Sequence, residues 1–187
     1  MTQRTMFTKE KIVEAAYQLT REAGWQGVTA RSIAVKLGSS TMPLYSSLKS
    51  MGDIETEVRA RAEACLHAYQ GRRLVSEPLL SAAVGYVAFA RDEKNLFRFL
   101  YVDRPLAANR PGAGGRAVDA VRAGGIVDIA DQAAVAMKDP RILKSWAFTH
   151  GLASLISSGV LDLPDESIAR LLLEMGAAIY GTEGGSA

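Results

Sequence analysis

Residues 29–50 read TARSIAVKLGSSTMPLYSSLKS, two short amphipathic stretches on either side of a glycine. Thr29 is placed to cap a helix, because its hydroxyl can accept a hydrogen bond from a first-turn N–H. Gly38 can end that helix, since glycine tolerates the left-handed backbone of a helix stop. Ser40 or Thr41 can open the next helix, which continues through Leu44 and Leu48. The segment therefore predicts two helices joined by a tight turn.

Helix signals continue on both sides of this segment. Thr8 can cap a first helix, and Gly24 can end it. Ser50 with Asp53 three residues on has the spacing of a capping box. From there an apolar stripe at helical spacing runs to about Ser76. The predicted fourth helix is therefore roughly 25 residues long.

The remaining sequence also contains residues that typically start or end helices. Asp103 to Arg116 reads DRPLAANRPGAGGR and predicts a loop. No stretch of useful length shows the alternation of Val, Ile and Thr with other residues that would predict a β-strand. The fold class is therefore expected to be all-α with about nine helices. The last five are expected from Pro78 to about Ala90, over Asn95–Val102, over Ala117–Met137, from Asp139-Pro140 to about Gly159, and from Pro164 to near Gly181.

The positive charge is concentrated near the N-terminus. Residues 1–52 hold seven Lys or Arg and three Glu, a net charge of +4, and the total of +2 leaves −2 for residues 53–187. A basic N-terminal module joined to a slightly acidic remainder suits phosphate binding, although the net charge of solvent-exposed helix faces also varies by this amount. We expect a basic, phosphate-binding domain over residues 1–52 and a second domain over 53–187, connected by the helix 53–76.

Several other classes of protein are disfavoured by composition. The single cysteine, Cys65, permits no intrachain disulfide, and core packing explains it better than redox sensing. The N-terminus has no apolar run typical of a signal peptide, and the uncharged stretch 145–161 is too short to span a membrane. We therefore expect a cytoplasmic protein. No nucleophile–base pattern, metal-ligand cluster or cofactor motif is present, so neither an enzyme nor a metal or cofactor site is predicted.

The segment 8–58 resembles the N-terminal DNA-binding segment of tetracycline-repressor-type (TetR-type) regulators. Members show Thr-x-x-x-Ile-Ala, a glycine-containing turn, a Leu-Tyr pair and an acidic opening of the fourth helix. The positions that match in register are Thr29, Ile33, Ala34, Gly38, Leu44, Tyr45, Leu48, Lys49, Ser50, Asp53 and Ile54. The resemblance implies a helix-turn-helix whose second helix enters the major groove of a double-stranded DNA operator.

The same resemblance assigns expected roles to individual residues. Thr29, Tyr45 and Lys49 would hold phosphates, although Thr29 also serves as a helix cap and Tyr45 could be a core aromatic. Arg31 would reach a phosphate or a guanine edge, Thr41, Met42 and Pro43 would meet bases, and Ser40 and Ser46 would face the DNA. The full DNA-binding set is Thr29, Arg31, Ser40, Thr41, Met42, Pro43, Tyr45, Ser46 and Lys49. Ser46, Ser47 and Met51-Gly52 depart from the usual pattern, and Leu48 keeps an apolar residue where an aromatic is usual, which puts the strength of operator binding in doubt.

The C-terminal part resembles the TetR-type subfamily named for its Trp-His-Gly signature, here Trp146 and His150-Gly151, with Lys94 in place of the usual proline. By this resemblance an apolar or aromatic effector would bind a set of aromatic, Met and His side chains. Core packing is the alternative for each of them, and for His150 in particular. The set is Tyr86, Phe89, Phe97, Tyr101, Met137, Trp146 and His150.

The last two helices carry small and apolar residues together. The resemblance implies that they form a homodimer interface, and the alternative is an intrachain helical hairpin. By the same resemblance, residues 1–52 would be a helix-turn-helix DNA-binding domain and residues 53–187 a ligand-binding and dimerisation domain. The function expected from all of these features is a ligand-responsive homodimeric transcriptional regulator, most simply a repressor released from a palindromic operator by a small molecule. The alternative is a small-molecule-binding helical protein whose DNA-binding segment is degenerate.

Overall fold

The computed structural model describes residues 7–41, 50–103 and 139–181, and within these ranges the chain is helical with no strand. This confirms the all-α class. Seven α-helices lie in the described ranges; the other two of the nine predicted helices fall on residues 42–49 and 117–137, outside them. The elements are α1 (Lys9–Ala23), η1 (Trp25–Gly27), α2 (Ala30–Lys36), α4 (Met51–Gln70), α5 (Pro78–Asp92), α6 (Lys94–Arg98), η2 (Phe99–Asp103), α9 (Pro140–Ser157) and α10 (Asp165–Tyr180). None of the described helices is long and apolar enough to cross a membrane.

The helices begin at the capping residues that the sequence indicates. The Thr8 side chain accepts a hydrogen bond from the Lys11 amide at the start of α1, and Ser50 accepts one of 3.2 Å from the Asp53 amide at the start of α4. Asp139 accepts one of 2.9 Å from the Arg141 amide at the start of α9. Each of these side chains satisfies a first-turn N–H that has no partner within its helix.

The fourth helix is shorter than predicted. It ends at Gln70 rather than near Ser76. The chain after it is held by Ser81 in the first turn of α5, whose hydroxyl donates to the Arg72 carbonyl at 2.7 Å and accepts from the Leu74 amide at 2.9 Å. These hydrogen bonds replace the helical ones that residues 71–76 would otherwise make.

The predicted helix over Asn95–Val102 divides into two conformations. α6 is an α-helix only over Lys94–Arg98, and η2 continues it as a π-helix over Phe99–Asp103. The Arg59 guanidinium, from α4, donates to the main-chain carbonyls of Phe99 and Leu100 at 3.4 Å each. A long-range donor at these carbonyls competes with ordinary helical hydrogen bonding, which the sequence of the segment alone does not reveal.

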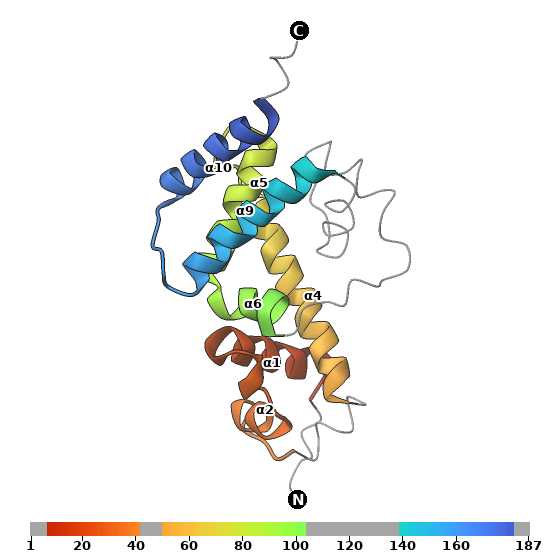
Figure 1. Cartoon of the computed structure of the whole chain (residues 1–187). Coiled ribbons are helices and arrows are strands. Elements are labelled where there is room, and N and C mark those ends of the chain that lie inside the picture. The colour runs from red at the N-terminus through yellow and green to blue at the C-terminus, as the bar shows by residue number, and fades with distance from the viewer. Residues whose placement is uncertain (1–6, 42–49, 104–138, 182–187) are drawn as a thin grey trace, which may run out of the picture. The chain divides into compact units, whose positions relative to one another are not determined.

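The chain divides into two compact units. The head unit comprises Met1–Ala64 and Asn95–Pro105, and the body unit comprises Cys65–Lys94 and Leu106–Ala187. The head unit has a core of fully buried apolar side chains from α1, α2, α4, α6 and η2. In the body unit α5, α9 and α10 pack against one another (Figure 1). The largest fully buried side chains among the described residues are Ile12, Ile33, Val58, Leu96, Phe97, Phe99 and Leu100 in the head unit, and Leu66, Val84, Phe89, Ile156 and Ile168 in the body unit.

A glycine allows a close helix contact inside the body unit. A Cβ atom on Gly85 of α5 would lie 2.3 Å from the main-chain oxygen of Tyr69, near the end of α4. The rings of Tyr69 in α4 and Phe89 in α5 also make an edge-to-face contact, with centroids 5.6 Å apart. The backbones of α4 and α5 therefore meet here at a distance that only glycine permits.

Candidate nucleic-acid interface

The N-terminal end of α2 is fixed by a reciprocal capping box between Thr29 and Ser32. The Ser32 amide donates to the Thr29 hydroxyl at 3.0 Å, and the Thr29 amide donates to the Ser32 hydroxyl at 2.8 Å. The Ser32 hydroxyl also donates to the Gly27 carbonyl at 2.9 Å, which ties the helix start to η1. The predicted capping role of Thr29 is confirmed, and its side chain remains exposed at the surface.

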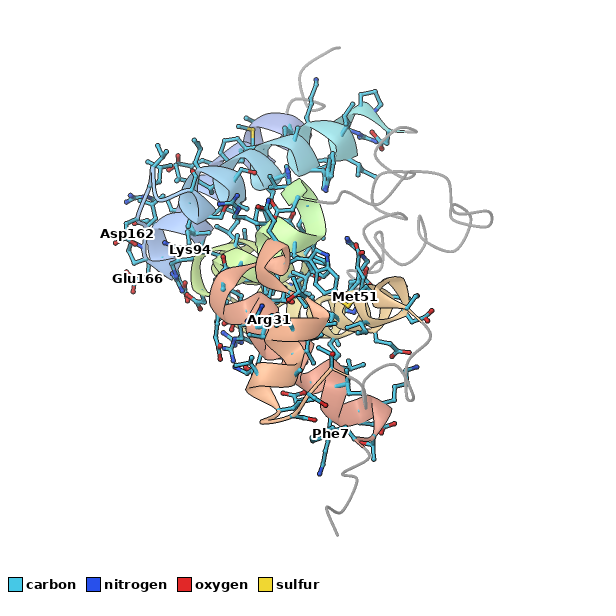
Figure 2. All side chains as sticks on the ribbon, turned by 90° about the horizontal axis from the view of Figure 1, so that it is seen from below. Phe7, Arg31, Met51, Lys94, Asp162 and Glu166 are labelled. Carbon is cyan, nitrogen blue, oxygen red and sulfur yellow. The ribbon has the colours of Figure 1, made fainter. Side chains whose placement is uncertain are left out.

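Arg31 is an exposed cation on this helix, and Figure 2 labels it there. Within the described residues Arg31 has no ion pair or hydrogen bond, whereas Lys36 at the other end of α2 forms an ion pair with Glu22 of α1 at 2.8 Å. Both residues border a shallow, open groove between α1 and α2. Its lining residues are Leu19, Thr29, Arg31, Ser32, Val35 and Lys36. The positive charge of Arg31 is therefore available to an anionic partner.

The turn after α2 has the geometry expected of a helix-turn-helix. Gly38 has a φ of +64°, a conformation that side chains with a Cβ disfavour. The Gly38 amide donates to the Val35 carbonyl at 3.0 Å, and the Ser39 amide donates to the Ala34 carbonyl at 2.9 Å. The chain then leads to Ser40 and Thr41, both exposed. The other predicted base-facing and phosphate-facing positions, Met42, Pro43, Tyr45, Ser46 and Lys49, lie outside the described residues.

α1 and the first half of α4 are joined by ion pairs at the surface of the head unit. Lys9 pairs with Glu57, and Arg61 pairs with Glu14. The hydrogen bond with Glu57 raises the pKa of Lys9 above its ordinary value. All four side chains are substantially exposed, so each pair adds little stability. They do neutralise part of the basic character of the N-terminal segment.

A cluster around Phe99 packs against η1 and the end of α1 within the head unit. The ring of Phe99 lies 5.1 Å from that of Trp25 in η1, and the Arg59 guanidinium lies 4.8 Å above the Phe99 ring. The Asn95 side chain donates to the Arg21 carbonyl at 2.9 Å, near the end of α1. The sequence did not predict these long-range contacts. The local signal is the aromatic-rich stretch Phe97–Tyr101, of which Phe97 and Tyr101 were predicted to bind the effector.

Three of the predicted effector-binding residues contact one another in the body unit. Tyr86 Oη and His150 Nδ1 share a hydrogen bond of 2.9 Å. The Trp146 and His150 rings, one turn apart on α9, stack with centroids 5.5 Å apart and planes inclined by 16°. Burial lowers the pKa of His150 below its ordinary value, so the imidazole is neutral at pH 7.

The remaining predicted effector-binding residues are placed differently. Phe89 is fully buried and packs on Tyr69 in the core of the body unit. Phe97 and Tyr101 contact each other, with ring centroids 5.0 Å apart, but they belong to the head unit. Met137 lies outside the described residues. Within the described ranges, no group of three or more His, Cys, Asp or Glu side chains could hold a metal ion.

The last two helices bury one apolar face and expose another. Ala153, Ile156, Ile168 and Leu172 are buried within the body unit, so part of the hairpin packing is intrachain. Several large apolar side chains of the same helices and of the turn between them stay exposed. These are Leu143, Leu155, Val160, Leu173 and Tyr180, with exposed fractions of 40%, 44%, 67%, 60% and 46%.

Comparison with known proteins agrees with the sequence and the architecture. Residues 79–178, more than half of the chain, match the family model of the tetracyclin repressor-like C-terminal domain. The chain is also 25% identical over 166 residues to an uncharacterized HTH-type transcriptional regulator of Mycobacterium tuberculosis, covering 83% of this chain and 72% of that protein. Assignment to the Trp-His-Gly subfamily stays a prediction. The protein belongs to the tetracyclin repressor-like (TetR) family and is a transcriptional regulator, not an enzyme.

Proposed function

We propose that this regulator is a homodimeric repressor that binds a palindromic operator and is released from it by a small molecule. The observation that carries the proposal is the position of Phe99. This residue follows α5 and α6 in the chain, yet it contacts both Trp25 and Arg59 in the core of the head unit. A change in the body of the protein can therefore reach the DNA-binding segment through a short, continuous stretch of chain.

At the DNA, we assign the backbone-positioning and base-reading roles to different residues. Arg31 is exposed and has no counter-charge among the described residues, so it can neutralise a phosphate or donate to a guanine edge. Thr29 and, from the sequence, Tyr45 and Lys49 hold phosphates. Ser40, Thr41, Met42, Pro43 and Ser46 face bases, as the order of the motif implies. The Gly38 turn supplies the change of direction between the two helices.

The dimer interface is assigned to α9 and α10. The exposed apolar side chains on these helices, such as Leu155 and Leu173, are not covered by the protomer itself. Burial of such a surface against a second copy stabilises the pair by removing apolar area from water. A two-fold dimer would present two recognition helices about one helical turn, roughly 34–36 Å, apart on DNA.

Release from the operator follows from differential affinity. A small molecule can shift the regulator only if it binds one conformation of the body more tightly than another. We assign the link to the head unit to the Phe99 contacts and to the hydrogen bond from Asn95 to the Arg21 carbonyl. These contacts hold the segment 95–103 against α1 and η1, so displacement of that segment would disturb the support of α2.

The test is selection of bound duplexes from a random DNA library by the purified full chain at two salt concentrations. The proposal expects a palindromic motif with half-sites one turn apart and binding that weakens steeply with salt. Recovery of no motif would contradict it. In that case a small-molecule-binding protein with a degenerate DNA-binding segment becomes the better account, as the departures at Ser46, Ser47 and Gly52 already allow.

A further inference from the structure

Helix α10 begins without the side-chain cap that starts α1, α5 and α9. Thr8, Glu77 and Asp139 each accept a hydrogen bond from a first-turn amide of those three helices. The residue before α10 is Pro164, whose side chain makes no cap. Because a cap holds the chain where it enters a helix, the direction of α10 is not fixed by its own first turn.

Arg91, in the last turn of α5, makes the contact that holds the start of α10. Its Nη1 group donates to the Leu163 main-chain carbonyl at 3.2 Å and to Oδ1 of Asp165, the first residue of α10, at 2.7 Å. Its Nε group donates to Oδ1 of the neighbouring Asp92 at 2.9 Å, which orients the guanidinium. One side chain therefore joins the end of α5 to residues 72 and 74 positions further along the chain.

The charges at the two helix ends agree with this contact. Asp165 and Glu166 lie in the first turn of α10, where the helix dipole favours carboxylates, and Arg91 lies in the last turn of α5, where it favours a cation. Figure 2 labels Asp162 and Glu166 on either side of this contact. The planar fork of arginine can hold several acceptors in one geometry, whereas the lysine ammonium is a point charge. The Arg91 contacts therefore set a position as well as supplying an attraction.

The start of α10 determines where the exposed face of that helix lies. Ile168 and Leu172 are buried within the body unit, while Leu173 and Tyr180, two turns apart, are 60% and 46% exposed. At 1.5 Å per residue, Tyr180 lies roughly 22 Å along the axis from Asp165, so a tilt of about 5° at the start would move it by about 2 Å. Apolar interfaces pack as closely as protein interiors, so a shift of this size would remove contacts across an interface.

We propose that Arg91 is the positioning residue of the homodimer interface. Its contacts with Leu163 and Asp165 hold α10 in the direction that brings the exposed apolar face of the helix against a second copy of this chain. The inference rests on the proposed function, since only a homodimer has such an interface. It goes further by naming a residue that lies outside the two interface helices and acts on them through the start of α10.

The test measures the dimer dissociation constant of the full chain by fluorescence-detected sedimentation. Arg91→Met keeps the length of the side chain but removes every donor, and should raise the dissociation constant at least about tenfold. Arg91→Lys keeps the charge but not the fork, so its constant should lie between those of the wild type and Arg91→Met. The matched control is Arg61→Met in the head unit, which loses an ion pair with Glu14 and should leave the constant unchanged. Circular dichroism checks that each variant is folded at the temperature of the measurement.

A second substitution separates the positioning of α10 from a general loss of stability. Asp165→Asn keeps the size of the side chain but weakens the contact with Arg91, so it should raise the dimer dissociation constant by itself. In that background Arg91→Met should have a smaller effect than in the wild type, because the two substitutions remove the same contact. If each substitution only lowered the stability of the fold, their effects on the dissociation constant would be independent.

The proposal is overturned if folded Arg91→Met dimerises as tightly as the wild type, or if its effect is undiminished in the Asp165→Asn background. Should Arg91→Met not fold, Arg91→Lys and Asp165→Asn decide the matter, and a wild-type dissociation constant for both would overturn the proposal. Failure of the proposed function looks different. A wild-type chain that stays monomeric at every concentration would remove the homodimer itself before any variant is compared.

Discussion

Trp25 and Phe99 lie with their ring centroids 5.1 Å apart and their planes inclined by 31°, although one follows the first helix and the other follows the sixth. The contact places a segment from the middle of the chain in the core of the head unit. The Arg59 guanidinium lies 4.8 Å from the centroid of the Phe99 ring and donates to the main-chain carbonyls of Phe99 and Leu100. The DNA-binding segment therefore depends for its support on residues outside the first 64.

The first prediction concerns this support. Phe99 is fully buried, so Phe99→Ala should lower the free energy of unfolding by about 3–5 kcal/mol, the cost of removing a core aromatic ring. Val102 in the same π-helix is 55% exposed, and Val102→Ala should change the free energy of unfolding by less than about 0.5 kcal/mol. Urea denaturation of both variants checks the difference. Similar losses for the two would show that Phe99 is not part of a packed core.

The second prediction compares two cations on α2. Arg31→Ala should weaken DNA binding by about 1–3 kcal/mol, because its charge has no partner among the described residues and is available to DNA. Lys36→Ala should have a smaller effect, since Lys36 already pairs with Glu22 at 2.8 Å. Fluorescence anisotropy with a selected duplex, repeated at several salt concentrations, measures both. A larger loss for Lys36→Ala would reverse the assignment.

The third prediction tests the close contact between α4 and α5 in the body unit. Gly85→Ala should cost about 1–3 kcal/mol of stability, because the new Cβ would lie 2.3 Å from the Tyr69 carbonyl oxygen. Gly151→Ala in α9 is the matched control, since a Cβ there meets nothing within 4 Å. It should raise stability by about 0.5–1 kcal/mol through helix propensity. Thermal unfolding of the two variants should move in opposite directions, and a neutral Gly85→Ala would contradict the contact.

The fourth prediction is a pH dependence. Burial lowers the pKa of His150 below its ordinary value of 6.5, so the unfolded chain binds this proton more readily than the folded chain. The contribution of His150 to stability is therefore full above about pH 6.5 and declines as the pH falls from there towards the folded-state pKa. Between pH 7.5 and 5.5 the urea midpoint of His150→Gln should fall less than that of the wild type. Parallel profiles would show that His150 is not buried in a neutral form.

The fifth prediction addresses assembly. Leu173 on α10 is 60% exposed, and Leu173→Glu should halve the mass measured by light scattering, because a carboxylate cannot be buried in an apolar interface. Leu79→Glu on α5, at a position 49% exposed, should leave the mass unchanged. If the Leu173→Glu protein stayed dimeric, the interface would lie elsewhere. If the wild type were monomeric, there would be no dimer interface.

Local signals in the sequence were sufficient to predict where helices begin. Thr8, Thr29, Ser50 and Asp139 act on their own first turns, so the information lies within a few residues. The end of α4 was predicted wrongly because it depends on Ser81, which lies beyond the helix and draws the chain into a turn. The π-helix depends in the same way on Arg59. Tertiary contacts override local propensity at both places.

The candidate sites were predictable to different degrees. The capping role of Thr29 and the positive φ of Gly38 follow from motif spacing, and the structure has both. Helical spacing placed Trp146 and His150 on one face, and the structure shows their rings stacked. The hydrogen bond between Tyr86 and His150 joins two helices and could not be read from local spacing, and a common effector site stays a prediction. Phe97 was predicted to bind the effector, and the structure places it in the core of the head unit together with Phe99. An aromatic stripe has the same spacing whether it lines a binding site or a core, so the sequence does not distinguish the two.

The most direct test of the account is the mass of the complex between the full chain and a duplex of its selected sequence, measured by native mass spectrometry. The account predicts two protomers on each duplex that carries both half-sites, and loss of that species when one half-site is scrambled. A complex with a single protomer on the intact duplex would contradict the homodimeric regulator.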